Sequence, residues 1–321
     1  RAMSTLLDVR GLSGTVPGPQ GPKSVVRAVS LNLDRGEALA LVGESWSGKT
    51  MSALDHMGLL PHGPRLPGGA RIRVGDREIG GDVTRGMESL RGGTVALVSQ
   101  NGSSALNPVR RVGDQIREVL RTHGTAGDRG DLVRALELLD EMGLKQPERV
   151  AASYPHQLSG GMQQRALVAV ALAGEPELLI ADEPTSALDA PLRLQLLDLL
   201  ARLGRTRRIG LLLITHDFSV VGRASSRVMV FHAGQTVEEG ATAQVLGAPR
   251  HPYTQALVAA LPFGGRPKER FAVTEGPQGL PEGPGCSFRG RCPLAESRCG
   301  HDPRLEKVAD GRRVRCWVTG P

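Results

Sequence analysis

One stretch of the chain has the residue types and the spacing of a phosphate-binding loop. Residues 43–50 fit the Walker A pattern GxxxxGK[ST] between a predicted strand and a predicted helix. Glycines let backbone N–H groups turn toward phosphate oxygens, the lysine can reach the β- and γ-phosphates, and the threonine hydroxyl can bind Mg²⁺. The alternative is an ordinary glycine-rich turn. The predicted phosphate-binding residues are Gly43, Glu44, Ser45, Trp46, Ser47, Gly48, Lys49 and Thr50, with Thr50 also a ligand of Mg²⁺.

A second stretch places two carboxylates at the end of a hydrophobic strand. Residues 178–181, Leu-Leu-Ile-Ala, are followed by Asp182 and Glu183, which matches the Walker B pattern. One carboxylate there can hold Mg²⁺, and the next can polarise an attacking water molecule as a general base. We therefore predict that Asp182 binds Mg²⁺ and that Glu183 is the base. The alternative is a pair of acidic residues at the start of a helix, which Pro184 favours.

The third motif is the most specific. Residues 158–165 read Leu-Ser-Gly-Gly-Met-Gln-Gln-Arg and lie between the other two motifs. A glycine-containing helix N-terminus suits a γ-phosphate, although a lone tetrapeptide of this kind is as often a helix cap. With an LSGGQ-type signature in this position, the chain resembles the ATP-binding cassette (ABC) family. The resemblance implies ATP and Mg²⁺ as cofactors, and it implies that Ser159, Gly160 and Gly161 act on ATP held by the Walker A motif of a partner cassette.

Further motifs stand in the order that this family has. Gln100 follows the apolar strand 94–99, where the family's Q-loop glutamine sits, and His216 follows the apolar strand 209–214 at the place of the switch histidine. Residues 186–189, Ser-Ala-Leu-Asp, match the D-loop. The resemblance implies that Gln100 binds Mg²⁺ and acts in catalysis with His216, and that Asp189 belongs to the ATP site. For each of these residues taken alone, the alternative is an ordinary polar residue of a loop.

Three segments and the tail narrow the resemblance to one branch of the family. Residues 104–109, 153–161 and 251–254 look like the ATPase subunits of oligopeptide, dipeptide and nickel importers. The resemblance implies a homologous second ATPase subunit, two transmembrane permease subunits and a solute-binding protein as partners. It places the chain at the cytoplasmic face of the membrane, with residues 100–109 and the helical segment against the permeases. The expected function is ATP hydrolysis that powers peptide import.

Two alternatives to peptide import stay open. The same importer class carries nickel and other small solutes, and the sequence does not name the solute. A soluble ABC ATPase of DNA repair or translation is the other alternative, although it predicts a coiled-coil insert or a second cassette, which the sequence lacks.

The chain departs from the family pattern at two places. Trp46 stands where the Walker A motif usually has a small residue, so its side chain must point away from the nucleotide. Val16 stands where an adenine-stacking aromatic residue is usual, so adenine packing is expected to be weaker or to come from Val26 or from the partner.

All four cysteines lie in the last 36 residues, with the spacing C-x5-C-x6-C-x16-C. A cytosolic protein favours metal ligation over disulfides, and the tail lacks the C-x2-C pairs of zinc ribbons. We predict a [4Fe-4S] cluster with a structural or sensing role, in a tail that buries little apolar surface. Zinc, nucleic acid binding by the tail, and free or disulfide-bonded thiols are the alternatives. The predicted cluster ligands are Cys286, Cys292, Cys299 and Cys316.

The strands and helices that must position these residues are predicted to be those of an α/β protein. Apolar runs at 37–42, 94–99, 178–181 and 209–214 are typical of parallel strands covered on both faces, and residues 110–150 have helical spacing. The expected fold is an ABC-type P-loop NTPase with a RecA-like core, an antiparallel β subdomain and a helical subdomain at about 101–165. We expect a nucleotide-binding domain over 1–240 and a cysteine-bearing C-terminal extension over 241–321.

Composition limits the remaining classes of protein. Hydrophobic residues make up 40% of the 321 residues, which excludes global disorder. No apolar run reaches the ~18–20 residues that span a bilayer, so a membrane role requires partners. The net charge is +7, but aromatic residues are only 3%, and we expect no nucleic acid partner.

Overall fold

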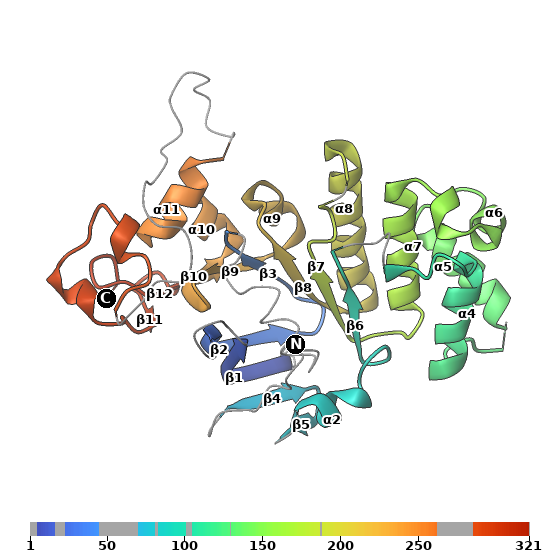
Figure 1. Ribbon diagram of the computed structural model, residues 1–321, viewed down its shortest axis with the longest axis horizontal. Helices are drawn as coiled ribbons and strands as arrows, with labels where there is room; N and C mark the ends of the chain where they lie inside the picture. The colour runs from blue at the N-terminus through green and yellow to red at the C-terminus, as the bar shows by residue number, and fades with distance from the viewer. Residues whose placement is uncertain are drawn as a thin grey trace. The chain divides into compact units, whose positions relative to one another are not determined.

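The computed structural model describes residues 5–16, 23–44, 70–80, 83–100, 105–128, 130–186, 188–261 and 285–320 (Figure 1). Residues 45–50 of the Walker A motif lie outside the described residues. The chain divides into two compact units. Unit 1 consists of residues 1–6, 33–37 and 85–213, and unit 2 consists of residues 7–32, 38–84 and 214–321.

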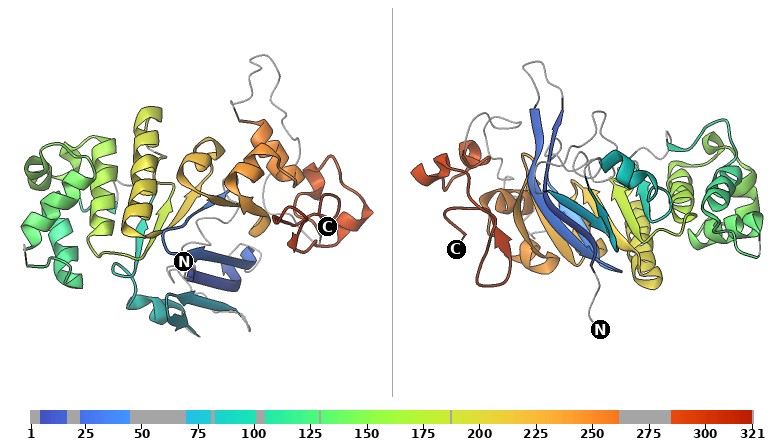
Figure 2. Two further views of the ribbon diagram at one scale, coloured as in Figure 1. Left: turned by 180° about the vertical axis from the view of Figure 1, so that it is seen from behind. Right: turned by 90° about the horizontal axis from the view of Figure 1, so that it is seen from below.

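Unit 2 contains an antiparallel sheet from the N-terminal part of the chain. Its order is β2 (Lys23–Asp34), β1 (Thr5–Val16), β4 (Arg71–Val74) and β5 (Arg77–Ile79). Alternate residues of β4 are buried, as expected when one face of the sheet packs on a core. The predicted antiparallel β subdomain is therefore confirmed (Figure 2).

A second set of strands in unit 2 carries the start of the Walker A motif. β3 (Ala38–Val42) runs parallel to β9 (Arg227–His232), and β10 (Gln235–Ala241) pairs antiparallel with β9. The C-terminal extension adds two short strands, β12 (Arg313–Val314) against β10 and β11 (Glu306–Lys307) against β12. Helices α9 (Phe218–Ala224), α10 (Thr242–Gly247) and α11 (Pro252–Ala259) complete this part.

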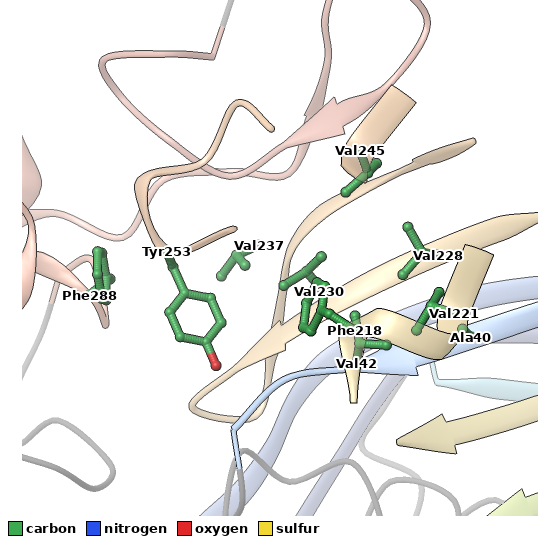
Figure 3. Packing of buried hydrophobic residues seen from close by; sticks show 10 residues of the cluster. All are labelled: Ala40, Val42, Phe218, Val221, Val228, Val230, Val237, Val245, Tyr253 and Phe288. Atoms are coloured by element: carbon green, nitrogen blue, oxygen red, sulfur yellow. The ribbon is translucent and has the colours of Figure 1, made fainter. Parts of the chain in front are cut away.

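The core of unit 2 includes a residue of the cysteine-bearing tail. Phe288 is 1% exposed and belongs to one cluster with Tyr253, Val230 and Val237, all labelled in Figure 3. The rings of Tyr253 and Phe288 lie 5.4 Å apart between centroids. The tail therefore buries apolar surface against the strands, contrary to the expectation from its glycine and proline content.

Among the described residues, unit 1 holds three neighbouring strands and most of the helices. The strands are β6 (Val95–Val98), β7 (Leu178–Asp182) and most of β8 (Gly210–Thr215), in the order β8-β7-β6. Every residue of β7 and β8 is buried, as their continuous apolar runs predict. Helix α2 (Val83–Glu88) precedes β6, and α8 (Ala190–Arg207) lies between β7 and β8 in the chain.

In the part of the predicted helical segment that the structure describes, four helices pack together. They are α4 (Val112–His123), α5 (Asp131–Glu141), α6 (Pro147–Ala152) and α7 (Gly160–Leu172), and the 3₁₀ turn η1 (Pro155–Gln157) precedes α7. No helix in the described ranges has both the length and the apolar composition to cross a membrane.

Candidate functional site

The Walker B carboxylates lie at the end of a fully buried strand. Asp182 is the last residue of β7 and is 6% exposed. Glu183 follows with φ at 47°, the left-handed region that a non-glycine residue adopts at a cost of about 1–3 kcal/mol. The carbonyl of Glu183 accepts a hydrogen bond of 3.2 Å from the N–H of Ser186, which closes a tight turn. Such an outlier at a strand end is a feature of functional sites.

The signature motif is the N-terminus of α7, as predicted. Ser159 is the N-cap, and its hydroxyl accepts a 3.4 Å hydrogen bond from the N–H of Met162. The side chain of Gln163 donates to the carbonyls of Pro155 at 2.8 Å and Leu158 at 3.0 Å, which fixes the preceding turn. Ser159 and Gly160 are exposed. The motif therefore presents a capped helix N-terminus to its surroundings.

Gly161 has a packing reason to be glycine. It is buried, and a Cβ at this position would lie 2.9 Å from Cδ1 of Leu192 on α8. The second glycine of the motif therefore lets α7 approach α8, and the first stays accessible.

The D-loop and the Q-loop contact each other within unit 1. The hydroxyl of Ser186 donates to the carbonyl of Gln100 at 3.4 Å, and Gln100 is exposed just beyond β6. Asp189 is the N-cap of α8, because its carboxylate accepts from the N–H of Leu192 at 3.0 Å. Asp189 thus has a structural task in this chain besides its predicted place in the ATP site.

His216 follows β8 and is exposed, as predicted from the sequence. The next residue, Asp217, caps α9 by accepting from the N–H of Ser219 at 3.0 Å. The N–H of Asp217 donates to the hydroxyl of Thr215 at 3.0 Å. These bonds fix the backbone on both sides of His216.

The first two residues of the Walker A motif, Gly43 and Glu44, follow β3 in unit 2. The other predicted residues of the motif lie outside the described residues: Ser45, Trp46, Ser47, Gly48, Lys49 and Thr50. Val26, one of the alternatives named for packing against adenine, is fully buried in β2, so that alternative is not supported, because a side chain with no exposed surface is part of the core.

Glu44 makes contacts that the sequence did not indicate. Its N–H donates to the hydroxyl of Tyr253 at 2.8 Å, and its carboxylate accepts two hydrogen bonds from Arg291 at 3.0 and 2.9 Å. Tyr253 stands in the segment 251–254 that marked the resemblance, but that pattern carried no role for it. No local signal could have found Arg291, which lies between two cysteines of the tail.

The rings around Tyr253 form a buried group in unit 2. His232 lies 4.4 Å from Tyr253 between ring centroids, and burial lowers the pKa of His232 to about 4. Burial likewise lowers the pKa of His251 to about 3 and raises the pKa of Tyr253 above its ordinary value. Both histidines are therefore neutral, and the tyrosine keeps its hydroxyl proton, at neutral pH.

The four cysteines lie in the extension of unit 2 as free thiols, Cys299 buried and the others partly buried. Burial raises the pKa of Cys286, and the nearby thiols of Cys299, Cys316 and Cys292 raise it further. Within the part of the chain that the structure describes, however, no group of three or more His, Cys, Asp or Glu side chains could hold a metal ion. The predicted metal site at these cysteines is therefore not supported by the geometry, although the donor type is suitable.

Comparison with known proteins decides the family. The family described as ABC transporter matches residues 26–186, and the one described as oligopeptide/dipeptide transporter, C-terminal region, matches residues 237–299. The dipeptide transport ATP-binding protein DppD of Escherichia coli (strain K12) is 39% identical over 314 residues, which cover 97% of this chain and 96% of that protein. The chain belongs to the ABC transporter family.

Other relatives place this ABC protein among the ATP-binding proteins of dipeptide and oligopeptide importers. The oligopeptide transport ATP-binding protein AppD of Bacillus subtilis (strain 168) is 38% identical over an alignment that covers 98% of this chain and 97% of that protein. A dimeric structure of the ATP-binding cassette MJ0796 with ADP and Pi bound has a TM-score of 0.64 and 25% identity, and it covers 74% of this chain and 99% of its own. The predicted ABC-type ATPase and its α/β cassette fold are therefore confirmed, and the C-terminal extension is present.

Proposed function

We propose that this chain hydrolyses ATP to power the import of di- or oligopeptides through a membrane ABC transporter. The observation that carries the proposal is the identity of 36–40% to dipeptide and oligopeptide transport ATP-binding proteins over nearly the whole chain. The match of residues 237–299 to the oligopeptide/dipeptide C-terminal region supports the same substrate class. Nickel or another small solute of the same importer class is the alternative cargo.

The residues proposed for hydrolysis have distinct roles. Lys49 binds the phosphates, and Thr50, Asp182 and Gln100 hold Mg²⁺; the bound ion neutralises phosphate charge. The buried carboxylate of Asp182 at the end of β7 is the oxygen donor type that Mg²⁺ prefers. Glu183 accepts a proton from the attacking water. Its left-handed backbone conformation sets the direction in which the side chain leaves the main chain. His216 is proposed as the switch histidine.

The signature motif is proposed to act on a second cassette. Ser159 and Gly160 lie exposed at the N-terminus of α7, and the positive end of the helix dipole favours a phosphate there. The MJ0796 cassette is dimeric, which supports a cassette dimer here. The partner that we propose is a homologous second ATPase subunit.

Two permease subunits and a solute-binding protein complete the proposed transporter, with this chain on the cytoplasmic face of the membrane. The segment 100–109, which the resemblance places against the permeases, has an apolar side chain in solvent, since Val109 is 80% exposed. The proposed domain limits are 1–240 for the nucleotide-binding domain, with its helical subdomain at about 101–165, and 241–321 for the extension.

Reconstitution tests this function. The chain, purified together with the permeases and the second ATPase, is placed in lipid vesicles with the solute-binding protein and ATP. We expect uptake of a dipeptide that depends on ATP and that Glu183→Gln abolishes. Uptake of nickel without uptake of peptide would show that the transported solute is nickel and not a peptide. Failure to copurify with any permease would favour a soluble ABC ATPase.

We further propose that the cysteines of the extension bind one [4Fe-4S] cluster. The support is the donor type and its place in the chain, since all four cysteines are free thiols within the last 36 residues; the described side chains do not themselves form a group of three or more that could hold a metal ion. Zinc is the alternative metal. Anaerobic purification followed by iron, sulfide and zinc analysis decides between them. About four iron and four sulfide per chain are expected, and their loss in Cys292→Ser; stoichiometric zinc without sulfide would refute the cluster.

A further inference from the structure

A cavity of about 540 Å³ is lined entirely by residues of unit 1 that the proposed hydrolysis does not use. Its volume is within the range of pockets that hold small molecules. Of its lining residues only Pro176 and Ile209 are apolar, and an apolar ligand would take water from the charged ones at a cost. The cavity therefore suits a charged, hydrogen-bonding ligand. Its charged lining consists of Arg35, Arg134, Glu175, Glu177, Arg207 and Arg208.

The cavity lies at the other end of the strands from the residues proposed for hydrolysis. Glu177 directly precedes β7, and Ile209 directly precedes β8. Asp182 ends β7, and His216 follows β8. A strand rises about 3.3 Å per residue, so the five residues of β7 separate its two ends by roughly 16 Å. The N–H of Gly210 donates to the carbonyl of Glu177 at 2.8 Å, which joins the starts of the two strands into a fixed edge.

Two side chains of the cavity stand on a backbone conformation that favours glycine. Of the six described non-glycine residues with a positive φ, Glu175 and Arg208 line this cavity, at 53° and 55°. Arg208 is the C-cap of α8, close to where glycine usually ends a helix. Such outliers cluster at active sites and ligand clamps. A glycine at position 208 would fit the backbone better, so the helix itself does not explain the arginine.

Carboxylates outside the lining hold two of the arginines in place. Arg207 makes two hydrogen bonds to the carboxylate of Glu141, one of them from Nε at 3.0 Å. Arg134 pairs with Glu137 at 3.2 Å. Such pairs orient a guanidinium group but use only some of its five N–H groups, so the others can donate to a ligand.

Arg208 differs from the other arginines of the lining, because no carboxylate pairs with it. Its side chain is exposed and makes no ion pair or hydrogen bond within the part of the chain that the structure describes. A guanidinium group binds phosphate oxygens through parallel, charge-assisted hydrogen bonds. A phosphate also has enough acceptor oxygens to meet Arg208 and a second arginine at once. Phosphate is therefore the ligand group that this position favours.

The glutamates of the lining supply hydrogen-bond acceptors. Glu175 pairs with Arg134 at 3.5 Å, and its side chain is 55% exposed. Glu177 pairs with Arg35 at 2.6 Å, and its side chain is 42% exposed. A carboxylate has about four acceptor sites, so each can still accept from a ligand hydroxyl. Guanidinium donors and carboxylate acceptors in one cavity suit a ligand that carries a phosphate together with hydroxyl groups.

We propose that this cavity binds a small molecule of the sugar phosphate class, with Arg208 on its phosphate and Glu175 on one of its hydroxyl groups. The strained backbone at both positions is then explained, because each keeps a side chain that the ligand needs. The site is additional to the proposed ATP site and does not depend on it.

Isothermal titration calorimetry of the full chain tests the site, with ribose 5-phosphate, glucose 6-phosphate and glycerol 3-phosphate as probes. We expect saturable binding of at least one probe, with one molecule per chain. Arg208→Gly should raise its dissociation constant at least about tenfold, because a charge-assisted bond to phosphate is lost. The matched control is Arg205→Ala, which removes an exposed arginine from the last turn of α8 outside the cavity lining and should change the constant less than about twofold.

Thermal unfolding of the same variants separates ligand binding from folding. Arg208→Gly and Glu175→Gly place glycine at left-handed positions, so neither should lower the melting temperature. Glu175→Gly should weaken binding of the sugar phosphate about threefold, because it removes an acceptor for a hydroxyl group. It should not weaken binding of inorganic phosphate, which has no sugar hydroxyl.

Each other outcome overturns the inference. Absence of saturable binding by all three probes does so, and so does binding that Arg208→Gly leaves unchanged. Equal affinity for inorganic phosphate and for the sugar phosphate would refute the ligand class. A lower melting temperature in Arg208→Gly would show that the arginine serves the helix. Loss of binding in Lys49→Ala but not in Arg208→Gly would place the ligand at the proposed ATP site.

Discussion

At the scale of single residues, Glu183 joins a chemical task to an unusual backbone. Its positive φ comes directly after a fully buried strand, so the buried strand and the turn to Ser186 must hold a conformation that the residue itself disfavours. A glycine would adopt this conformation without strain but would carry no carboxylate. The chain therefore has a carboxylate at this position together with a strained backbone conformation.

Glu183→Gln is expected to lower ATP hydrolysis at least about a hundredfold and to leave ATP affinity within about twofold, because the amide keeps the size of the side chain and loses the base. Lys49→Ala is the contrast, since it removes a charge-assisted phosphate contact and should weaken binding itself. The two quantities are measured separately, by nucleotide titration and by phosphate release. Hydrolysis near the wild-type rate in Glu183→Gln would show that the base is another residue.

The sequence predicted the chain positions of the Walker B, signature and switch residues because each ends a strand or begins a helix within a few residues of its own motif. Arg291 could not be predicted in this way. Its partner Glu44 is 247 positions earlier, and the contact exists only because the extension folds back onto the strands of unit 2. Val26 was one alternative for packing against adenine, and its place in the sequence near the missing aromatic residue does not tell which face of β2 its side chain occupies.

At the scale of elements, the signature motif shows how two glycines divide their tasks. Gly160 leaves the helix N-terminus of α7 open, and Gly161 allows close contact with Leu192 of α8. Leu192 lies in the first turn of α8, and Asp189 is the N-cap of that helix. The signature motif therefore packs against the first turn of the helix that the D-loop residue Asp189 caps.

Ser159→Arg is expected to lower ATP hydrolysis more than about tenfold while the chain's own affinity for ATP changes little, because the motif is proposed to act on ATP held by the partner cassette. The readouts are nucleotide titration of the isolated chain and hydrolysis by the assembled pair. Ala152→Arg, which adds the same charge at an exposed position near the end of α6, is the control and should hydrolyse normally. Normal hydrolysis in Ser159→Arg would refute the role of the motif.

The elements differ from the sequence expectation where glycine interrupts a helical pattern. Residues 110–150 read as a helical segment, but Gly124 ends α4 in the left-handed conformation at φ 66°, and Gly143 follows α5 at φ 71°. Hydrophobic periodicity predicts well that a segment is helical, but it predicts poorly how many helices the segment contains. A single capping residue can end a helix, whereas the periodic pattern is spread over many residues.

At the scale of the whole molecule, stability should depend on two buried histidines. The pKa of His232 is lowered to about 4 and that of His251 to about 3, chiefly by burial. The unfolded chain, with histidine pKa near 6.5, then binds more protons than the folded chain below that pH. Stability is therefore full above about pH 6.5 and falls as the pH drops toward 4.

Between pH 7 and pH 5 the loss should be roughly 1–2 kcal/mol for each of these histidines. Urea unfolding across this range measures it. His232→Asn should reduce the slope of stability against pH, and His156→Asn, which removes an exposed histidine, should leave the slope unchanged. A stability that does not change between pH 7 and pH 5 would contradict the burial of neutral histidines.

The short strands of the extension have a consequence for how the protein can be shortened. β12 covers the free side of β10 at Glu238 and Glu239, and β11 covers β12 with two exposed, charged residues, Glu306 and Lys307. A chain cut before residue 285 would leave the N–H and C=O groups of β10 open to pairing with another copy, which is how exposed sheet edges aggregate. We therefore expect the extension to shield this sheet edge, so that size-exclusion chromatography of the shortened chain shows large assemblies that the full chain does not form.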